Sequence, residues 1–331
     1  MEISRLLNKI AEECGLGTIT AQVKRVSGGY MHKMVCLETA TGKYAVKLLN
    51  PVIMKRPDVF TNYRTAEELE QVLQENGIPL VPALEFNDKK MQCVDHQYFY
   101  VFPWVDGRAL RPGEIQKEHC EAAGTLLARI HKTKQMQSQP AEEGTCIAWD
   151  AYTKLATDKC PEIADLLLEN RELLYTSWEE GNRARREVPA ITSICNGDMD
   201  SKNVLWVKGE PKLIDLESLR YGNPYPEFFS LALSWSGCEH GSVNYENLRA
   251  FIRAYRQIYG AIEADWSVLY SCNTGWLSWL EYNVKRALRI ECENEEERGL
   301  GIAQVIYTMR HILYYRAIRE ELLEQLNALP D

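Results

Sequence analysis

The sequence lacks the features that would place the protein in a membrane, outside the cell or on nucleic acid. Its longest strongly apolar stretch, Tyr98 to Val105, is far shorter than the roughly 20 residues that a helix needs to cross a bilayer. The first residues do not combine a basic segment with an apolar one, so we expect no secretion signal. The net charge of −9 disfavours a broad basic surface for nucleic acid. We therefore expect a cytoplasmic protein without a nucleic-acid or membrane partner.

Closely spaced cysteines are also missing, and so are internal repeats. The ten cysteines are scattered, and no two have the C-x-x-C spacing of many zinc and redox sites. In a chain of 331 residues this pattern favours reduced thiols in a cytosolic enzyme over a disulfide framework. Only Cys195 lies near the polar loop described below, and core packing is the favoured role for it.

The chain contains enough apolar material for two domains. Its 331 residues, 45% of them hydrophobic, exceed what a single core usually supports. Strand-like segments predominate up to residues 106–107, and amphipathic helices follow. We therefore predict an α+β protein with two lobes. Residues 1–105 form a small antiparallel sheet with one main helix, and residues 106–331 form a larger, mostly helical lobe.

Hydrophobic periodicity and turn residues place the individual elements. In the first lobe we predict helices over 1–15 and 62–76, and strands over 19–26, 34–38, 44–49, 84–86 and 98–102. In the second lobe we predict helices over 118–131, 160–178, 226–235, 245–259, 267–288 and 300–329. The acidic run 291–297 is expected to be a solvated loop.

A polar loop followed by a hairpin carries the strongest chemical signal. The loop holds Asp198 and, five residues later, Asn203; two apolar runs and a turn at Gly209 then lead to Asp215. Three oxygen-bearing side chains at the edges of a small hairpin can supply one base and two ligands for a divalent cation. Phosphoryl transfer needs this layout, because the protein mainly positions groups and neutralises charge. An ordinary surface hairpin is the alternative, since Asp and Asn are common in turns.

A glycine turn and a lysine lie in the predicted sheet. The turn is formed by Ser27, Gly28 and Gly29, and such a turn lets backbone N–H groups approach phosphate oxygens. Lys47 shares its strand face with apolar neighbours, where an unpaired ammonium would be costly. We therefore expect Lys47 to have a carboxylate partner and an anionic ligand. The alternative is an edge lysine beside an ordinary hairpin.

The carboxylate partner is expected on the helix over 62–76. Leu69, Val72 and Leu73 define its buried face, and Glu68 lies one turn before Val72 on nearly the same side. Glu67 is the competing residue. We select Glu68 as the partner of Lys47, although the rotation of the helix is not determined by the sequence.

The segment that joins the two lobes is compatible with purine binding. An adenine ring held between lobes needs one backbone carbonyl and one backbone N–H from such a connector. Pro103 retains its carbonyl, and Val105 retains its N–H. An aromatic linker without a ligand is the alternative.

Taken in order, these segments resemble the aminoglycoside phosphotransferase and choline kinase family. The resemblance covers residues 15 to at least 235 and implies a bilobal protein-kinase-like fold. The helix ending at His131 also resembles the family's helix before the catalytic loop, and we expect its histidine to be structural. The matching segments are Ser27-Gly28-Gly29, Val46-Lys47, the Glu-bearing helix, Phe102 to Gly107, Asn196-Gly197-Asp198 with Asn203, and Ile214-Asp215-Leu216-Glu217.

The resemblance implies chemical roles for the loop and hairpin residues. Asp198 matches the catalytic aspartate, which orients the acceptor hydroxyl and accepts its proton. Asn203 and Asp215 match the two residues that bind Mg²⁺. The implied activity is that of an ATP-dependent small-molecule kinase.

The resemblance also implies a nucleotide site in the first lobe. Lys47, paired with Glu68, would hold the α- and β-phosphates, and the turn 27–29 would cover the triphosphate. Pro103 and Val105 would contact the base. The expected cofactors are ATP, with GTP as the alternative, and Mg²⁺.

Two positions depart from the family pattern. Asn196 stands where the family usually has a loop-bracing histidine, and Leu216 stands where it has phenylalanine or tryptophan. Neither change touches an expected catalytic group.

The acceptor is expected to be a small hydroxylated molecule such as an aminoglycoside, an amino alcohol or a sugar. Aromatic and acidic residues of the helical lobe could bind a cationic amine or a sugar, although tryptophans at helical spacing usually pack in a core. The candidates are Glu239, Trp276, Trp279, Glu281 and Tyr282. The alternative function is a catalytically weak kinase-fold protein that serves for binding or as a scaffold.

Overall fold

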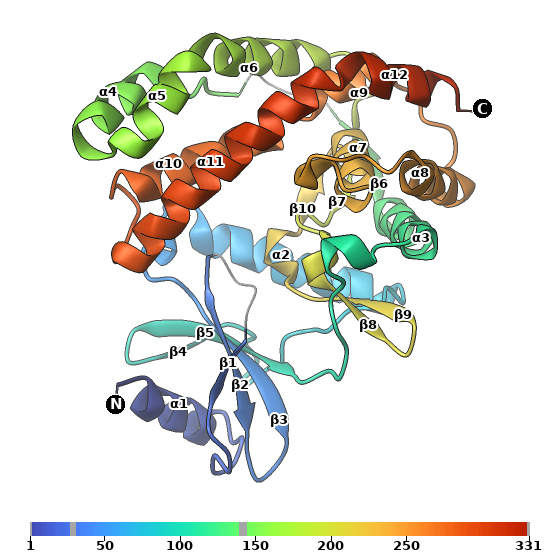
Figure 1. Ribbon diagram of the computed structural model, residues 1–331. Helices are drawn as coiled ribbons and strands as arrows, with labels where there is room; N and C mark the ends of the chain where they lie inside the picture. The colour runs from blue at the N-terminus through green and yellow to red at the C-terminus, as the bar shows by residue number, and fades with distance from the viewer. Residues whose placement is uncertain (1, 27–30, 139–143, 330–331) are drawn as a thin grey trace. The chain divides into compact units, whose positions relative to one another are not determined.

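The computed structural model describes residues 2–26, 31–138 and 144–329 (Figure 1). Contacts between Cα atoms divide the chain into two compact units. The first combines Met1–Leu110 with Ser201–Arg220, and the second combines Arg111–Asp200 with Tyr221–Asp331. The first unit therefore includes residues 201–220. The sequence-based prediction, in contrast, assigns these residues to the helical lobe.

The first unit is built on a five-stranded antiparallel sheet. Its strands have the order β1-β2-β3-β5-β4, so β3 lies at the centre, paired with β2 and β5. The strands are β1 (Lys24–Val26), β2 (Lys33–Glu38), β3 (Lys43–Leu48), β4 (Gln92–Val94) and β5 (Gln97–Pro103). Strand alternation sends neighbouring side chains of β3 to opposite faces of this sheet.

One face of the sheet packs against α1 (Glu2–Glu13), and the other packs against α2 (Val59–Glu75). Leu7 and Ile10 of α1 share a core with Val46 of β3. On the other face Tyr63 of α2 shares a core with Tyr100 of β5. Because Lys47 follows Val46, it lies on the α2 face of the sheet.

A small hairpin completes the first unit. It consists of β8 (Val204–Val207) and β9 (Glu210–Leu213), joined by the two-residue turn Lys208-Gly209. Both turn residues have positive φ, as a tight hairpin turn requires. The backbone of Leu213 also bonds to Pro79 and Val81, just after α2. These bonds tie the hairpin to the sheet unit.

The second unit is mainly helical, with a three-stranded sheet of order β10-β7-β6. Those strands are β6 (Gln135–Gln137), β7 (Ile191–Cys195) and β10 (Arg220–Gly222). Its helices are α3 (Lys117–Thr133), α4 (Trp149–Lys159), α5 (Pro161–Glu169), α6 (Arg171–Arg185), α7 (Pro224–Trp235), α8 (Tyr245–Tyr259), α9 (Trp266–Cys272), α10 (Gly275–Ala287), α11 (Glu295–Ala317) and α12 (Arg319–Asn327).

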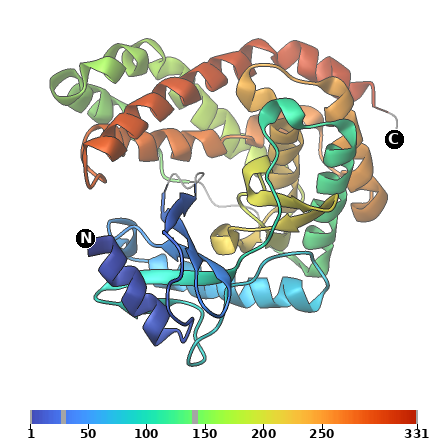
Figure 2. The ribbon, with the colours of Figure 1, turned by 60° about the horizontal axis from the view of Figure 1, so that its bottom comes forward.

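Two helix pairs organise this unit: α3 packs along α8, and α10 packs along α11 (Figures 1 and 2). Leu280 and Val284 of α10 share a core with Val305 and Met309 of α11. Gly124 of α3 permits the close approach to α8, because a Cβ there would overlap the backbone carbonyl of Phe251. No helix in the described ranges is long and apolar enough to cross a membrane.

The predicted helix over 245–259 is confirmed, and several longer predicted helices are broken in the structure. The segment 160–178 divides into α5 and α6, and 267–288 divides into α9 and α10. The predicted helix 300–329 starts earlier, at Glu295, and breaks before α12. The acidic run is therefore not all loop, because the Asn294 side chain accepts the N–H of Glu297 and acidic residues stabilise a helix N-terminus.

The edge strands of the first unit also differ from the prediction. The strand predicted over 19–26 is reduced to β1, and residues 84–86 form no strand beyond a single bridge from Phe86 to Lys89. The edge strand is instead β4. Short edge segments carry little hydrophobic alternation, so their pairing depends on the rest of the sheet.

We expect Gly124→Ala to lower the free energy of unfolding by about 1–3 kcal/mol, because α3 and α8 must separate to admit the methyl group. Gly299→Ala is the matched control. That glycine lies in α11 with nothing near its Cβ position, so alanine should stabilise the helix by about 0.5–1 kcal/mol. Urea denaturation of both variants tests the packing, and equal effects would contradict it.

Candidate active site

The hairpin brings both predicted metal ligands to one end. Val204 pairs with Leu213, and the next N–H, that of Ile214, donates to the carbonyl of Asn203 at 3.0 Å. Asn203 and Asp215 therefore stand at the same open end of β8 and β9. Carboxylate and amide oxygens are hard ligands that suit Mg²⁺.

Asp215 has an unusual backbone conformation. Its φ and ψ are both 60°, in the left-handed region that L residues rarely adopt, although Asp tolerates it better than most. Such strain persists only where the surroundings hold it, and it clusters at ligand-binding and catalytic sites. Asp215 therefore combines a strained backbone with a predicted metal-binding side chain.

Lys47 meets Asp215 on the α2 face of the sheet. Its Nζ lies 2.5 Å from Asp215 Oδ1 and 2.5 Å from Glu217 Oε2. The lysine is only 4% exposed, so its charge depends on these two carboxylates. Burial alone would lower the pKa of Lys47, but Asp215 and Glu217 outweigh burial and raise the pKa above its ordinary value.

Glu217 is held by further donors. His32 Nδ1 accepts the N–H of Asn50 at 2.9 Å, so the ring is a neutral imidazole that carries its proton on Nε2. That Nε2 lies 3.3 Å from Glu217 Oε1, and the hydroxyl of Tyr63 donates to Oε2 at 3.3 Å. Burial would raise the pKa of Glu217, but the charge of Lys47 and the hydrogen bond from His32 lower it well below its ordinary value. Glu217 is thus an ionised, fixed partner of Lys47.

The charges of this cluster do not balance. Lys47 contributes one positive charge, and the carboxylates of Asp215 and Glu217 contribute two negative charges. His32 is neutral by its hydrogen bonding. Among these four side chains one excess negative charge remains, and a divalent cation bound by Asp215 would offset it. The donor set and the charge both fit Mg²⁺.

The predicted pair between Lys47 and Glu68 is not formed. Glu68 is exposed on the outer side of α2, because the helix buries Tyr63, Ala66 and Glu70 instead. This rotation directs Glu67 toward the cavity that Lys47 lines. The prediction failed because Leu69, Val72 and Leu73 alone did not determine the rotation of the helix.

Glu67 and Glu70 have other partners within the described residues. The hydroxyl of Tyr100 donates to Glu67 Oε1 at 2.7 Å, and Lys90 Nζ donates to Glu70 Oε1 at 2.7 Å. Burial, together with Glu67, raises the pKa of the Tyr100 phenol above its ordinary value. Neither glutamate supplies the carboxylate for Lys47 in this structure.

The connector leaves the sheet where the sequence places it. Pro103 is the last residue of β5 and pairs with Tyr44, and the N–H of Trp104 donates to the carbonyl of Lys43 at 3.1 Å. Pro103 and Val105 are both half-buried. Ser27, Gly28 and Gly29 lie outside the described residues, so the nucleotide contacts of this turn and of the connector stay predictions.

Asp198 belongs to the second unit, in the loop after β7. Gly197 before it has a φ of 82°, a left-handed turn that favours glycine. The N–H of Asp198 donates to the side-chain oxygen of Asn196 at 3.1 Å. Asn196 therefore shapes this loop locally, and the carboxylate of Asp198 is half-buried.

Two of the acceptor candidates are engaged within the helical unit. The hydroxyl of Tyr152 donates to Glu281 Oε1 at 2.7 Å, and the indole N–H of Trp276 donates to the carbonyl of Asn273 at 2.7 Å. Trp276 also packs against the core of α10 and α11. The core-packing alternative therefore describes Trp276 well.

A sequence model described as the phosphotransferase enzyme family matches residues 22–269, which is more than half of the chain. The chain belongs to this family. The protein is therefore a phosphotransferase that acts on small molecules, and the family resemblance inferred from the sequence is confirmed. No curated protein sequence matches the chain.

Solved structures with little sequence identity share the fold. A spectinomycin phosphotransferase in complex with ADP and spectinomycin is 12% identical, with 94% of this chain and 98% of that chain covered and a TM-score of 0.66. An ethanolamine kinase from Plasmodium vivax is 15% identical, with 87% and 81% covered and a TM-score of 0.57. The predicted α+β, kinase-like fold of this phosphotransferase is confirmed.

Glu217, His32 and Tyr63 are the site residues that the sequence reasoning missed. Glu217 ends the Ile214–Glu217 motif and lies two residues after Asp215. Its place in this motif is the sequence feature that could have identified it as a site residue. His32 and Tyr63 carry no such signal, because only the packing of α2 on the sheet brings them to Glu217.

We expect Glu217→Gln to lower the free energy of unfolding by about 1–3 kcal/mol, because Lys47 and His32 lose a charged acceptor. Glu68→Gln is the matched control on the exposed side of α2 and should change the free energy by less than about 0.5 kcal/mol. Denaturant unfolding of the phosphotransferase measures both. Similar effects would mean that Glu217 is not the carboxylate on which the buried Lys47 depends.

Proposed function

We propose that this phosphotransferase moves the γ-phosphate of ATP to a hydroxyl group of a small molecule, with Asp198 as the base. Mg²⁺ would be held by Asn203 and Asp215, and Lys47 would bind the α- and β-phosphates. The observation that carries the proposal is the meeting of Lys47 with Asp215 beside Asn203 at the end of one hairpin. The charge imbalance of this cluster supports a divalent cation there.

Lys47 has two carboxylate partners with different surroundings. Glu217 is fixed by His32 and Tyr63, so it keeps Lys47 ionised and in place. Asp215 would then be the carboxylate that holds the cation, and the Lys47 ammonium would bind phosphate oxygens. Mg²⁺ would neutralise phosphate charge, which is the main task in phosphoryl transfer.

Asp198 would accept the proton of the acceptor hydroxyl. The oxygen of that hydroxyl forms a bond to the γ-phosphorus as the bond from this phosphorus to the bridging oxygen of ADP breaks. The products are the phosphorylated acceptor and ADP, and the proton remains on Asp198 until solvent removes it. A half-buried carboxylate on a fixed loop suits this role.

Ligands in the similar structures support the nucleotide and cation parts of the proposal. The spectinomycin phosphotransferase structure holds ADP and spectinomycin, and an amicoumacin kinase structure, 14% identical with a TM-score of 0.59, holds AMP-PNP and Ca²⁺. The proposed nucleotide contacts of this chain include Ser27, Gly28 and Gly29 above the phosphates and Pro103 and Val105 beside the base.

The proposed acceptor is a hydroxylated amine, sugar or amino alcohol, and the proposed location is the cytoplasm. All ten cysteines are free of disulfides, which agrees with a reducing compartment. GTP remains the alternative phosphate donor.

We expect Mg²⁺-dependent ADP release when the protein is mixed with ATP and an acceptor from a panel of hydroxylated amines, sugars and amino alcohols. Asp198→Asn should lower kcat by about 10²–10⁴-fold and leave nucleotide affinity within about twofold, because the side chain acts on the acceptor and not on ATP. A coupled ADP assay and calorimetry with AMP-PNP measure the two quantities.

Asp158→Asn makes the same chemical change on the exposed face of α4 and should retain full activity. The proposal is wrong if no acceptor stimulates ADP release and Mg²⁺ does not affect nucleotide binding. Full activity of Asp198→Asn would reject Asp198 as the base.

A further inference from the structure

A buried arginine in α10 has no carboxylate partner among the described residues. Arg286 is only 2% exposed, and arginine is almost never fully buried unless it is paired. The buried lysines follow this rule: Lys47 lies between two carboxylates, and Lys90 lies 2.7 Å from Glu70. A buried charge without a counter-charge is costly, so Arg286 requires a separate explanation.

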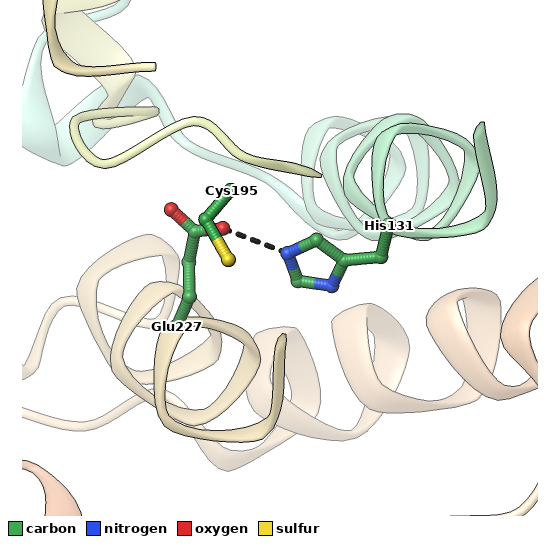
Figure 3. Close-up of side chains that lie close together, drawn as sticks. All are labelled: His131, Cys195 and Glu227. Carbon is green, nitrogen blue, oxygen red and sulfur yellow. Dashed lines mark hydrogen bonds and ion pairs between the residues drawn. The ribbon is translucent and has the colours of Figure 1, made fainter. Parts of the chain in front are cut away.

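The polar groups of a second buried cluster in the helical unit satisfy one another. His131 and Cys195 are enclosed beside Glu227 (Figure 3). Both ring nitrogens of His131 are bonded, one 2.7 Å from Glu227 Oε2 and the other 2.7 Å from the hydroxyl of Tyr255. In contrast, the charge of Arg286 is not matched within the described residues.

The guanidinium of Arg286 makes two weak contacts. Its Nη1 donates to Asn283 Oδ1 at 3.5 Å, which is longer than an ordinary N–H···O bond. The amide of Asn283 is held in this orientation because its Nδ2 donates to the carbonyl of Trp279 at 2.9 Å. The guanidinium carbon also lies 5.4 Å from the centre of the Tyr282 ring. A neutral oxygen and a ring face attract a cation much less than a carboxylate does.

The end of α10 does not supply the counter-charge. Arg286 lies in the last turn, where the helix dipole favours a cation. However, long side chains in a helix point back toward its N-terminus. The contacts with Asn283 and Tyr282 agree, because they place the guanidinium over the preceding turn. The charge is therefore directed away from the terminal carbonyl groups.

Acidic residues on α10 and in the loop after it bind other groups. Glu281 accepts the hydroxyl of Tyr152 at 2.7 Å and lies 3.1 Å from Lys285. Glu291 lies 3.7 Å from the same lysine. The neighbouring carboxylates thus surround Lys285, and Arg286 receives none of them.

One edge of the guanidinium is open to a ligand. Nε and Nη2 of Arg286 form no hydrogen bond within the described residues, and neither is among the sealed polar atoms that lack a partner. Both nitrogens therefore retain a little exposed surface. The rings beside them, Trp279 and Tyr282, are half-buried, so this face of α10 reaches the surface.

The free edge is the one that binds two oxygens of a single anion. Arg171 of the same unit shows this geometry: its Nε donates to Asp150 Oδ1 at 2.5 Å, and its Nη2 donates to Oδ2 at 2.9 Å. A carboxylate or phosphate group presents the same pair of oxygens to an arginine fork. Such a group would supply the counter-charge that Arg286 lacks.

We propose that Arg286 anchors an oxyanion-binding site on α10, which takes a carboxylate or phosphate group of a small molecule. The site belongs to the second unit, whereas Lys47 and Asp215 belong to the first. It does not depend on the proposed function. Two sources fit its chemistry: the acceptor of the proposed reaction, or a separate anionic ligand.

The Nε–H resonance of Arg286 reports directly on the site. In ¹H–¹⁵N spectra it is the arginine signal that is absent from Arg286→Met. We expect a saturable shift of this resonance when the wild type is titrated with inorganic phosphate or with malonate at constant ionic strength. No shift with either probe at about 50 mM, well above a millimolar Kd, would overturn the proposal.

Two variants separate a specific fork from a general charge effect. Arg310→Met is the matched control on the exposed face of α11, and it should leave the response of Arg286 unchanged. Arg286→Lys keeps the positive charge but lacks the fork, and it also serves for the assignment if Arg286→Met does not fold.

Melting temperatures compare these variants. Malonate at about ten times its Kd should raise the melting temperature of the wild type and of Arg310→Met by about 2 °C. The rise should be less than half as large in Arg286→Lys. An equal rise in Arg286→Lys and in the wild type would overturn two-point binding by the arginine.

Kinetics with an acceptor from the panel distinguish the two sources. A KM for the acceptor that rises about tenfold in Arg286→Lys, with KM for ATP unchanged, assigns the oxyanion to the acceptor. An unchanged KM for the acceptor assigns it to a separate ligand. If the wild type transfers no phosphate, the proposed function fails, and the resonance of Arg286 still decides whether the site exists.

Discussion

The packing of the first unit depends on the carboxylates that neutralise one buried ammonium group, that of Lys47. Lys47 has almost no contact with solvent, and a charge in that position is tolerated only beside fixed counter-charges. Asp215 and Glu217 provide them from the end of a hairpin, and His32 and Tyr63 hold Glu217. The central strand, α2 and the hairpin are thereby tied together through one cluster. Among these side chains one negative charge is in excess, and it lies on the same hairpin as Asn203, where the proposed phosphoryl transfer would use a divalent cation.

The second unit also contains a carboxylate that is fixed by several hydrogen-bond donors. A buried carboxylate, Glu227, collects one side-chain donor and two backbone donors and so fixes the loop before Asp198. The resemblance to known phosphotransferases implies a bracing histidine at position 196, and this chain has asparagine there. The side-chain oxygen of Asn196 accepts the N–H of Asp198, two residues along the same loop.

Much of this arrangement could be predicted from the sequence, and the failures have physical reasons. Strand alternation indicated that Lys47 needs a carboxylate partner, and the spacing of Asn203 and Asp215 indicated that a hairpin brings them together. The predicted partner of Lys47, Glu68, was wrong. A helix with apolar residues at 69, 72 and 73 can rotate enough to expose Glu68 and to turn Glu67 inward. The contacts of His32, Tyr63 and Glu227 join segments far apart in sequence, and no local pattern reports them.

The central claim is that the cluster of Lys47, Asp215 and Glu217 becomes a nucleotide site when a divalent cation neutralises it. The most direct measurement is calorimetric titration of the protein with AMP-PNP, with Mg²⁺ and then with EDTA. We predict that Mg²⁺ strengthens binding at least tenfold in the wild type and much less in Asp215→Asn, where the excess charge is absent. Equal affinity with and without Mg²⁺ in the wild type would contradict the account.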